Sequence, residues 1–191
     1  MAGCVSCDLS KQRNRVVPGE GSENADILFI GEAPGFNEDQ QGRPFVGAAG
    51  AFLDELLRSV GLSRETVYIA NVVKCRPPGN RDPLPNEIQS CKPWLEQQIE
   101  IIQPRVIVTL GRFSLARYIP GESISKVHGR ERRVGDKVVF PMYHPAAALH
   151  QGSLRRVIEE DMQKLPDVLA SLRSTDPDST VEEGGQQLAL F

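Results

Sequence analysis

The sequence predicts an α/β fold: three α/β/α layers around a mostly parallel, four-stranded central sheet. Four short runs rich in β-branched residues have the character of buried strands, and segments with helical periodicity separate or follow them. Such alternation places a parallel sheet between two helical layers. The 191 residues suffice for one such domain with a tail, and no apolar run is long enough to cross a membrane.

The expected strands are residues 27–30, 67–73, 106–110 and 138–142. Each is a short apolar run, as expected for strands that are covered on both faces. Because the carboxyl ends of parallel strands meet at one edge of a sheet, the residues that follow these runs are expected to form the functional site.

Four helices are expected between and after the strands. Residues 52–60 place their apolar side chains on one face, and Gly61 is a typical end signal. Residues 88–102 predict a second helix that is interrupted at Pro93 and ends before Pro104. Residues 111–119 predict a short third helix. The last helix starts at Ser153 and bends at Pro166.

The composition changes at residue 174. Residues 1–173 are expected to form the folded domain, and residues 174–191 a disordered tail, because the tail is too polar to bury much apolar surface. The tail nevertheless ends in Leu188-Ala189-Leu190-Phe191. An apolar cluster at this place is expected to bind the groove of a partner.

Charge is unevenly distributed along the chain. The net charge is −3, and removing the four acidic residues of the tail leaves the remaining residues at +1. A basic segment, residues 126–133, contains Lys126, Arg130, Arg132 and Arg133, and Arg155-Arg156 follow later. These residues predict either a face that contacts phosphates or a solvated surface of mixed charge. The N-terminus has no secretory signal pattern, so a cytoplasmic protein is expected.

The chain has four cysteines, with two residues between Cys4 and Cys7 and fifteen residues between Cys75 and Cys91. A zinc ribbon would more typically show a second close pair. The spacing therefore favours a larger inorganic core, such as an iron–sulfur cluster, over zinc or four unconnected thiols. Bound metal would close the Pro-rich loop after Cys75, a structural role.

Polar and small residues follow the predicted strands. Gly31, Glu32 and Ala33 follow the first strand, in a pattern that matches neither a dinucleotide nor a P-loop motif. Asn71 lies in an apolar run, where its amide needs hydrogen bonds from the backbone or from a ligand such as a base edge. His144 follows the fourth strand, in a structural or a catalytic role.

Four motifs together resemble the family 4 uracil-DNA glycosylases. They are Gly-Glu-Ala-Pro-Gly at 31–35, Gly-Arg-Pro-Phe-Val-Gly at 42–47, Asn-Val-Val-Lys-Cys-Arg-Pro-Pro at 71–78 and His-Pro at 144–145. The resemblance covers roughly residues 1–172. It implies a uracil-DNA glycosylase-like fold with a [4Fe-4S] cluster on Cys4, Cys7, Cys75 and Cys91. It also implies hydrolysis of the N-glycosidic bond of flipped deoxyuridine, which releases uracil and leaves an abasic site.

The resemblance also implies roles for site residues. Phe45 would stack on the flipped uracil, and Asn71 would accept from N3–H and donate to O4. Gly31, Glu32 and Ala33 would line the site, and His144 would donate to O2 as negative charge develops on the leaving base.

The carboxylate that positions the attacking water is open, because the best-known glycosylase family of the superfamily has an aspartate where this chain has Ala33. Glu32 is our catalytic candidate, with Glu38 and Asp39 as alternatives. Glu38 would otherwise exclude thymine by crowding C5.

Three further expectations concern DNA. Leu149 either inserts where the flipped base has left the stack or packs in the core. The segment 126–133 would follow phosphates, with His128 neutral or in contact with a phosphate. Residues 76–86 contain no histidine to trap the product covalently, so turnover is expected.

The tail residues Gln187, Leu188, Leu190 and Phe191 resemble the bacterial motif that binds the sliding clamp. Partners are therefore uracil-containing DNA and, as a hypothesis, the clamp, for a monomer associated with the nucleoid. A non-catalytic uracil-DNA-binding protein and an iron–sulfur electron carrier are the alternative functions.

Overall fold

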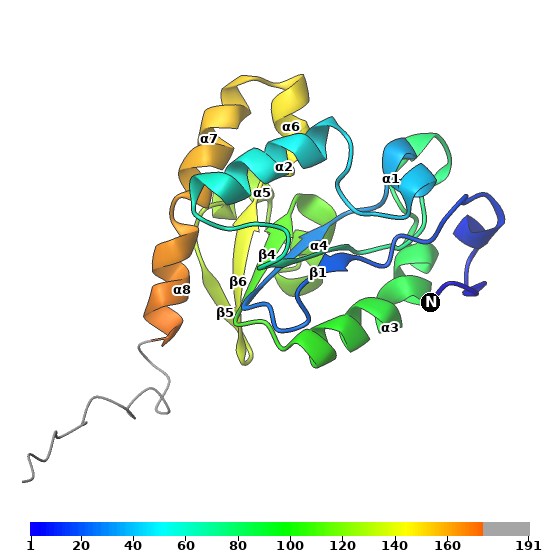
Figure 1. Ribbon diagram of the computed structural model, residues 1–191, viewed down its shortest axis with the longest axis horizontal. Coiled ribbons are helices and arrows are strands. Elements are labelled where there is room, and N and C mark those ends of the chain that lie inside the picture. Colours follow the sequence, from blue (N-terminus) through cyan, green and yellow to red (C-terminus); the bar gives the residue numbers. More distant parts are fainter. Residues whose placement is uncertain (174–191) are drawn as a thin grey trace, which may run out of the picture.

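One six-stranded sheet, in the order β1-β3-β2-β4-β6-β5, organises the computed structural model, which describes residues 1–173 (Figure 1). The central strands β3 (Tyr68–Asn71), β2 (Ile27–Gly31), β4 (Val106–Leu110) and β6 (Lys137–Met142) are parallel. The edge strands β1 (Glu20–Gly21) and β5 (Arg132–Val134) are antiparallel to their neighbours. The predicted α/β class and four parallel strands are confirmed, but the sheet is not four-stranded, because both edge strands are too short and polar to show an apolar pattern.

Helices cover both faces of the sheet. On one face lie α2 (Ala48–Ser59), α6 (Pro145–His150), α7 (Ser153–Met162) and α8 (Leu165–Arg173), and on the other face lie α3 (Pro85–Ile102) and α4 (Arg112–Tyr118). The helices α1 (Phe36–Gln41) and α5 (Ile124–Val127) are short. So are the 3₁₀ turns η1 (Asp8–Lys11) and η2 (Pro78–Asn80).

The central strand β2 shows why the strands are apolar throughout. Ile27 and Phe29 pack in the cluster under α2, α7 and α8. Leu28 and Ile30 point to the opposite face and pack in a second cluster with Leu95 of α3. Alternate side chains of a strand point to opposite faces, so a strand covered on both faces needs apolar residues at every position.

The predicted interruption at Pro93 is wrong, since α3 runs without a break from Pro85 to Ile102. Proline removes one helical N–H but does not forbid a helix that is held on both sides of it. Ile88 before the proline and Leu95 and Ile99 after it pack against the sheet, which keeps the two halves in one helix.

The predicted last helix is two helices, since α7 ends at Met162 and α8 starts at Leu165. Pro166 therefore lies in the first turn of α8, where an N–H has no helical partner in any case. The chain does not bend within one helix at this proline.

No helix within residues 1–173 is long and apolar enough to cross a membrane. The predicted disordered tail, with its clamp-binding-like residues 187–191, lies outside the described residues.

Candidate active site

The carboxyl ends of β2 and β3 place Gly31 and Asn71 opposite each other in the sheet. The Asn71 side chain is only 2% exposed, and its Oδ1 has no hydrogen-bond partner. A Cβ added to Gly31 would lie 2.4 Å from this oxygen, so no larger residue fits there. A buried acceptor without a partner is costly in a finished core, and this geometry favours the ligand over the backbone as its partner.

The Phe45 ring lies between the ends of β2 and β6. A Cβ on Gly31 would meet the ring at 2.7 Å, and the ring stacks on His144 with centroids 5.4 Å apart and an interplanar angle of 24°. Phe45, Asn71 and His144 come from distant parts of the chain. The tertiary structure therefore brings Asn71 and Phe45 together at Gly31 and places His144 against the Phe45 ring.

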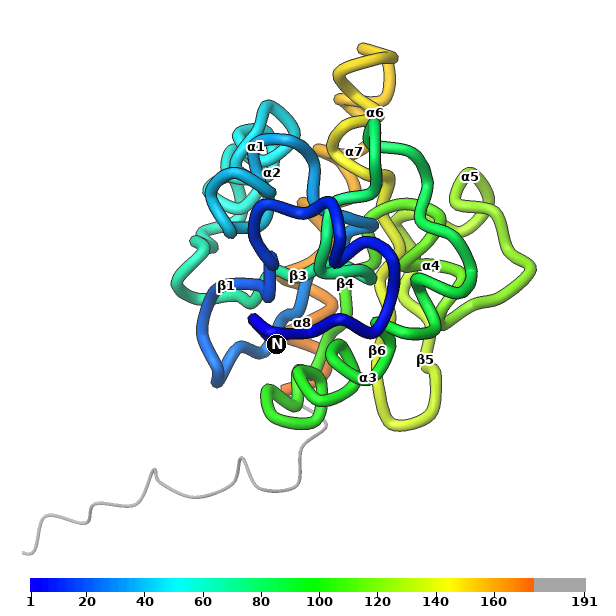
Figure 2. The backbone as a smooth tube through the Cα atoms, turned by 90° about the vertical axis from the view of Figure 1, so that its right-hand side faces the viewer, coloured from blue at the N-terminus to red at the C-terminus, as the bar shows by residue number. Residues whose placement is uncertain are grey.

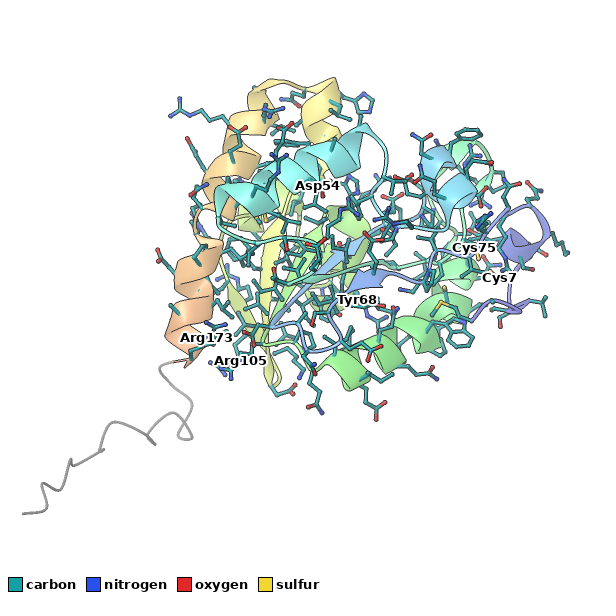
Figure 3. The ribbon with its side chains drawn as sticks, viewed as in Figure 1. Cys7, Asp54, Tyr68, Cys75, Arg105 and Arg173 are labelled. Carbon is teal, nitrogen blue, oxygen red and sulfur yellow. The ribbon has the colours of Figure 1, made fainter. Side chains whose placement is uncertain are left out.

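Arg64, between α2 and β3, holds the backbone at Pro44 and Phe45. Its guanidinium donates to the carbonyl oxygens of Pro44, at 2.9 Å, and Phe45. Glu20 and Asp54 accept from the same guanidinium at 2.8 and 2.6 Å and fix its orientation. Figure 3 labels Asp54 on α2, above the sheet. The contacts stabilise Phe45 in the left-handed conformation, with a φ of 53°.

Glu38 binds the backbone on the other side of Phe45, at Val46 and Gly47. Its Oε1 accepts from the backbone N–H groups of Val46 and Gly47 at 2.8 and 2.9 Å, and its Oε2 accepts from Gly35 at 3.1 Å. Both oxygens are thus occupied by backbone donors. Glu38 joins α1 to residues 42–47, which we call the Phe45 segment, and this makes it a positioning residue.

Asp39 and Glu32 differ completely in their surroundings. Asp39 is 1% exposed and accepts from the backbone N–H groups of Asn14 and Arg15 at 2.9 and 3.3 Å, so it anchors the N-terminal segment. Glu32 is partly buried, and no described residue donates a hydrogen bond to its side chain. Burial raises the pKa of Glu32, Asp82 raises it further and Arg112 opposes the shift.

The His144 ring is held as a neutral donor. Its Nδ1 accepts from the backbone N–H of Ala146 at 3.1 Å, at the start of α6, which leaves the proton on Nε2. Burial lowers the pKa of His144 to about 4, against a smaller opposite effect of Glu38. The imidazole therefore presents an N–H without a positive charge at neutral pH. Ala33, which was expected to line the site, packs against the apolar cluster on the α3 face.

The four cysteines line one pocket, between the N-terminal segment and the start of α3. Figure 2 shows the N-terminal segment beside the green α3 region, and Figure 3 shows Cys7 near Cys75. None of the four forms a disulfide. Within residues 1–173, no three His, Cys, Asp or Glu side chains are gathered closely enough to hold a single metal ion. The pocket thus collects four thiols without the tight grouping of a one-ion site.

Two nitrogen donors face the buried thiols. The Arg13 guanidinium donates to Cys75 Sγ at 3.2 Å, and the Lys74 backbone N–H donates to Cys91 Sγ at 3.3 Å. Burial raises the pKa of the Cys91 thiol to about 11. Since metals bind thiolates, a metal bound here displaces that proton.

Lys74 connects the cysteine pocket with Asn71. Its Nζ donates to the Asn71 carbonyl oxygen at 2.9 Å and to Gln98 Oε1 at 2.6 Å, and burial lowers its pKa to about 7. A lysine inside an apolar run is a sequence signal of a buried contact. For Arg64 the sequence offers no comparable signal, because its partners are carbonyl groups about 20 residues away.

The predicted DNA-contacting residues lie in distinct environments. Arg130, Arg132 and Arg133 are exposed and form no ion pair with any residue in 1–173, whereas Arg155 and Arg156 pair with glutamates. His128 Nδ1 lies 2.6 Å from Asp161 Oδ2, and its ring contacts Tyr143. Leu149, on α6, is 51% exposed, so core packing is wrong for this side chain.

Sequence similarity to known proteins covers most of this domain. The profile of the "Uracil DNA glycosylase superfamily" matches residues 18–165. A "Type-4 uracil-DNA glycosylase" from Sulfurisphaera tokodaii is 51% identical over 173 residues, 85% of this chain and 78% of that protein. Proteins of the same name from Archaeoglobus fulgidus and Thermotoga maritima are 48% and 50% identical, over 90% and 84% of this chain and 91% and 86% of theirs. The family resemblance expected from the motifs is confirmed.

Proposed function

The chain belongs to the uracil-DNA glycosylase superfamily, and from this premise we propose that it hydrolyses the N-glycosidic bond of deoxyuridine in DNA. The products are free uracil and an abasic site, the first step of base excision repair. The observation that carries the proposal is the convergence of Asn71 and Phe45 at Gly31, with His144 stacked on the Phe45 ring. The substrate nucleotide is flipped out of the stack, since its glycosidic bond is inaccessible within a duplex.

The amide of Asn71 selects the base. Its Oδ1, buried and without a partner, accepts from uracil N3–H, and its Nδ2 donates to O4. Cytosine presents an acceptor at N3 and a donor at C4, so the same amide opposes it on both atoms. Phe45 stacks on the ring, a contact that adds affinity without distinguishing bases.

His144 stabilises the departing base. Negative charge grows on uracil O2 as the bond breaks, and the Nε2–H of neutral His144 donates to this oxygen. A neutral donor fits because its pKa, about 4, keeps the imidazole uncharged at neutral pH. The hydrogen bond strengthens as the charge develops, so it favours the transition state over the bound substrate.

Glu32 orients the attacking water or stabilises the developing positive charge on the sugar. Glu38 and Asp39 are the alternatives, but both are engaged by backbone N–H groups. Ala33 has no group that could replace the carboxylate. The role of Glu38 is then to position the Phe45 segment, not to crowd the C5 position of the base.

The donor set of the cysteine pocket fits a [4Fe-4S] cluster on Cys4, Cys7, Cys75 and Cys91. Four thiols share one pocket, and N–H groups donate to two of the sulfurs. When bound, such a cluster cross-links the N-terminal segment to both ends of residues 76–90, which is a structural role. The proposed reaction is a hydrolysis, and none of its steps requires electron transfer.

Exposed side chains outside the base-binding site contact the DNA. Arg130, Arg132 and Arg133 meet backbone phosphates, and Leu149 fills the gap left by the flipped base. A monomer that binds DNA in this way is nucleoid-associated, and its affinity falls steeply with added salt. Clamp binding by the tail stays a prediction.

The test is excision from an oligonucleotide with one deoxyuridine, followed by alkali to cleave at abasic sites. We expect cleavage by the wild type and none of matched thymine or cytosine strands. His144→Ala should lower the single-turnover rate by about 10²–10³-fold and still bind the strand. His150→Ala, on an exposed residue of the same helix, is the control. A wild type that binds uracil-DNA without cleaving it would be a binding protein, and the proposal would be wrong.

A further inference from the structure

Phe36, the first residue of α1, is exposed in an unusual position. It follows the loop of residues 31–35 after β2, and 56% of its surface is accessible. Large aromatic side chains near the end of a central strand ordinarily pack into the domain. The apolar clusters on both faces of the sheet do not include it.

Arg76 covers part of this ring. Its guanidinium carbon lies 5.1 Å from the Phe36 ring centroid, and Asn80 Oδ1 accepts from its Nε at 2.7 Å. Within residues 1–173, Arg76 forms no ion pair, whereas neighbouring Arg81 pairs with Glu87 and Arg112 pairs with Asp82. The cation is therefore held in position, and its charge is not neutralised by a carboxylate.

The Phe36–Arg76 pair shares its support with the proposed uracil site. Glu38, two residues after Phe36, binds both Gly35 at the start of α1 and the backbone of Val46 and Gly47. One carboxylate thus fixes the position of the exposed ring relative to the segment that carries Phe45. Both rings lie beyond the carboxyl ends of the parallel strands, where the flipped nucleotide is proposed to bind.

We propose that Phe36 and Arg76 form a platform for the nucleotide next to the flipped deoxyuridine. The ring stacks on the neighbouring base, and the Arg76 guanidinium pairs with a phosphate of the same strand. An aromatic ring beside an uncompensated cation matches the two parts of a nucleotide, its base and its charged phosphate. The inference rests on the proposed function, since it places the platform on the strand that carries the uracil.

The test measures affinity for a single strand in which the deoxyuridine is replaced by its 2′-fluoroarabino analogue, which resists hydrolysis. Phe36→Ala should weaken binding about 10-fold. Replacing the base on one side of the analogue by a baseless tetrahydrofuran residue should weaken wild-type binding similarly. On that strand Phe36→Ala should cause no further loss, because the stacking partner is already gone.

Arg76→Gln should weaken binding to all strands and reduce the slope of log affinity against log salt by about one. Ile101→Ala is the control, because Ile101 is 69% exposed on α3 and should not contact DNA.

Two results would overturn the platform. One is that Phe36→Ala binds the strand as tightly as the wild type does. The other is that Phe36→Ala weakens binding by the same factor on every strand, whichever neighbouring base has been removed. The latter result would mean that the ring docks a different kind of partner or acts on the fold. Excision by the wild type is measured on a second strand of the same sequence that carries ordinary deoxyuridine. Its absence would contradict the proposed function, whereas normal excision with no effect of Phe36→Ala would contradict only the platform.

Discussion

Two segments at the carboxyl end of the sheet are fastened in different ways. The Phe45 segment is held by side chains from outside it, through Arg64, about 20 residues away, on one side and Glu38 of the preceding helix α1 on the other. The segment of residues 76–84 is held mostly by contacts within itself and the start of α3, such as Arg76 to Asn80 and Arg81 to Glu87. Cys75 and Cys91, which line the cysteine pocket, flank it on both sides.

The difference between these two segments indicates which part of the proposed site the polypeptide forms without a bound metal. The left-handed conformation of Phe45 costs about 1–3 kcal/mol, and hydrogen bonds to Arg64 and Glu38 offset that cost. The second segment has long-range side-chain contacts of its own, from Arg112 to Asp82 and from Arg76 to Phe36. However, Asp82, Arg112 and Phe36 are exposed, so we expect its position to depend also on the cysteines that flank it. We infer that the Phe45 segment is preorganised without metal and that residues 76–84 are not.

Glu32 and Glu38 make a similar contrast between two carboxylates that follow β2, one in the loop and one on α1. Both oxygens of Glu38 accept from backbone N–H groups, whereas no described residue donates to the Glu32 side chain. A carboxylate occupied by three donors stabilises structure, and one left without donors can bind a water or a substrate atom. The backbone N–H groups that donate to Glu38 therefore assign it to holding the structure, and Glu32 is left for the proposed reaction.

Among the changes that test these two contrasts, the largest effect is expected for Glu32→Gln, with a fall of about 10²-fold in the excision rate. In the proposed reaction Glu32 acts in its ionised form, and burial raises its pKa, so the rate should rise with pH through this pKa. His144, with a pKa of about 4, stays neutral over the same range. A pH profile of single-turnover excision should show an acid limb in the wild type that is absent in Glu32→Gln.

Glu38→Gln is the matched control for this experiment. It should lower thermal stability and keep the acid limb, because Glu38 holds backbone groups. An acid limb that persists in Glu32→Gln and disappears in Glu38→Gln would reverse the assignment.

A smaller effect is expected for Arg64→Ala, about 10-fold in kcat/KM for excision. The change leaves the Pro44 and Phe45 carbonyl groups without their donor and destabilises the fold by about 1–3 kcal/mol. Arg64→Lys, which retains the charge, should recover part of the stability but not the geometry of two carbonyl contacts. Urea unfolding and steady-state kinetics measure both effects.

Arg156→Ala serves as the control for Arg64, since it removes an exposed helical ion pair with Glu160. If Arg64→Ala lowered stability without changing kcat/KM, Arg64 would support the fold and not the position of Phe45.

The smallest effect on excision is expected for Cys91→Ser, a few-fold loss together with loss of bound iron. Amide hydrogen exchange should become faster in residues 76–84, because one anchor of this segment is removed. The amides of Val46 and Gly47, held by Glu38, should keep their protection. Equal loss of protection in both segments would show that the Phe45 segment also depends on the cysteines.

The sequence alone predicted much of the fold because its signals are local. The apolar runs identify all four parallel strands, and Gly61 and Ser153 identify helix boundaries within two residues of those observed. It did not predict the antiparallel edge strands, and it wrongly predicted an interruption at Pro93. Both errors concern elements that depend on packing against neighbours, which a local pattern does not contain.

For the site, the sequence determined which residues follow the strands, and hence that Asn71 and His144 belong to one edge. Their motifs also sufficed to identify the family. Only the tertiary structure decided that Glu38 and Asp39 hold backbone groups, that Arg64 supports Phe45 and that Leu149 is exposed. The physical reason is that a strand end is encoded by neighbouring residues, whereas the partner of a side chain depends on how distant segments pack.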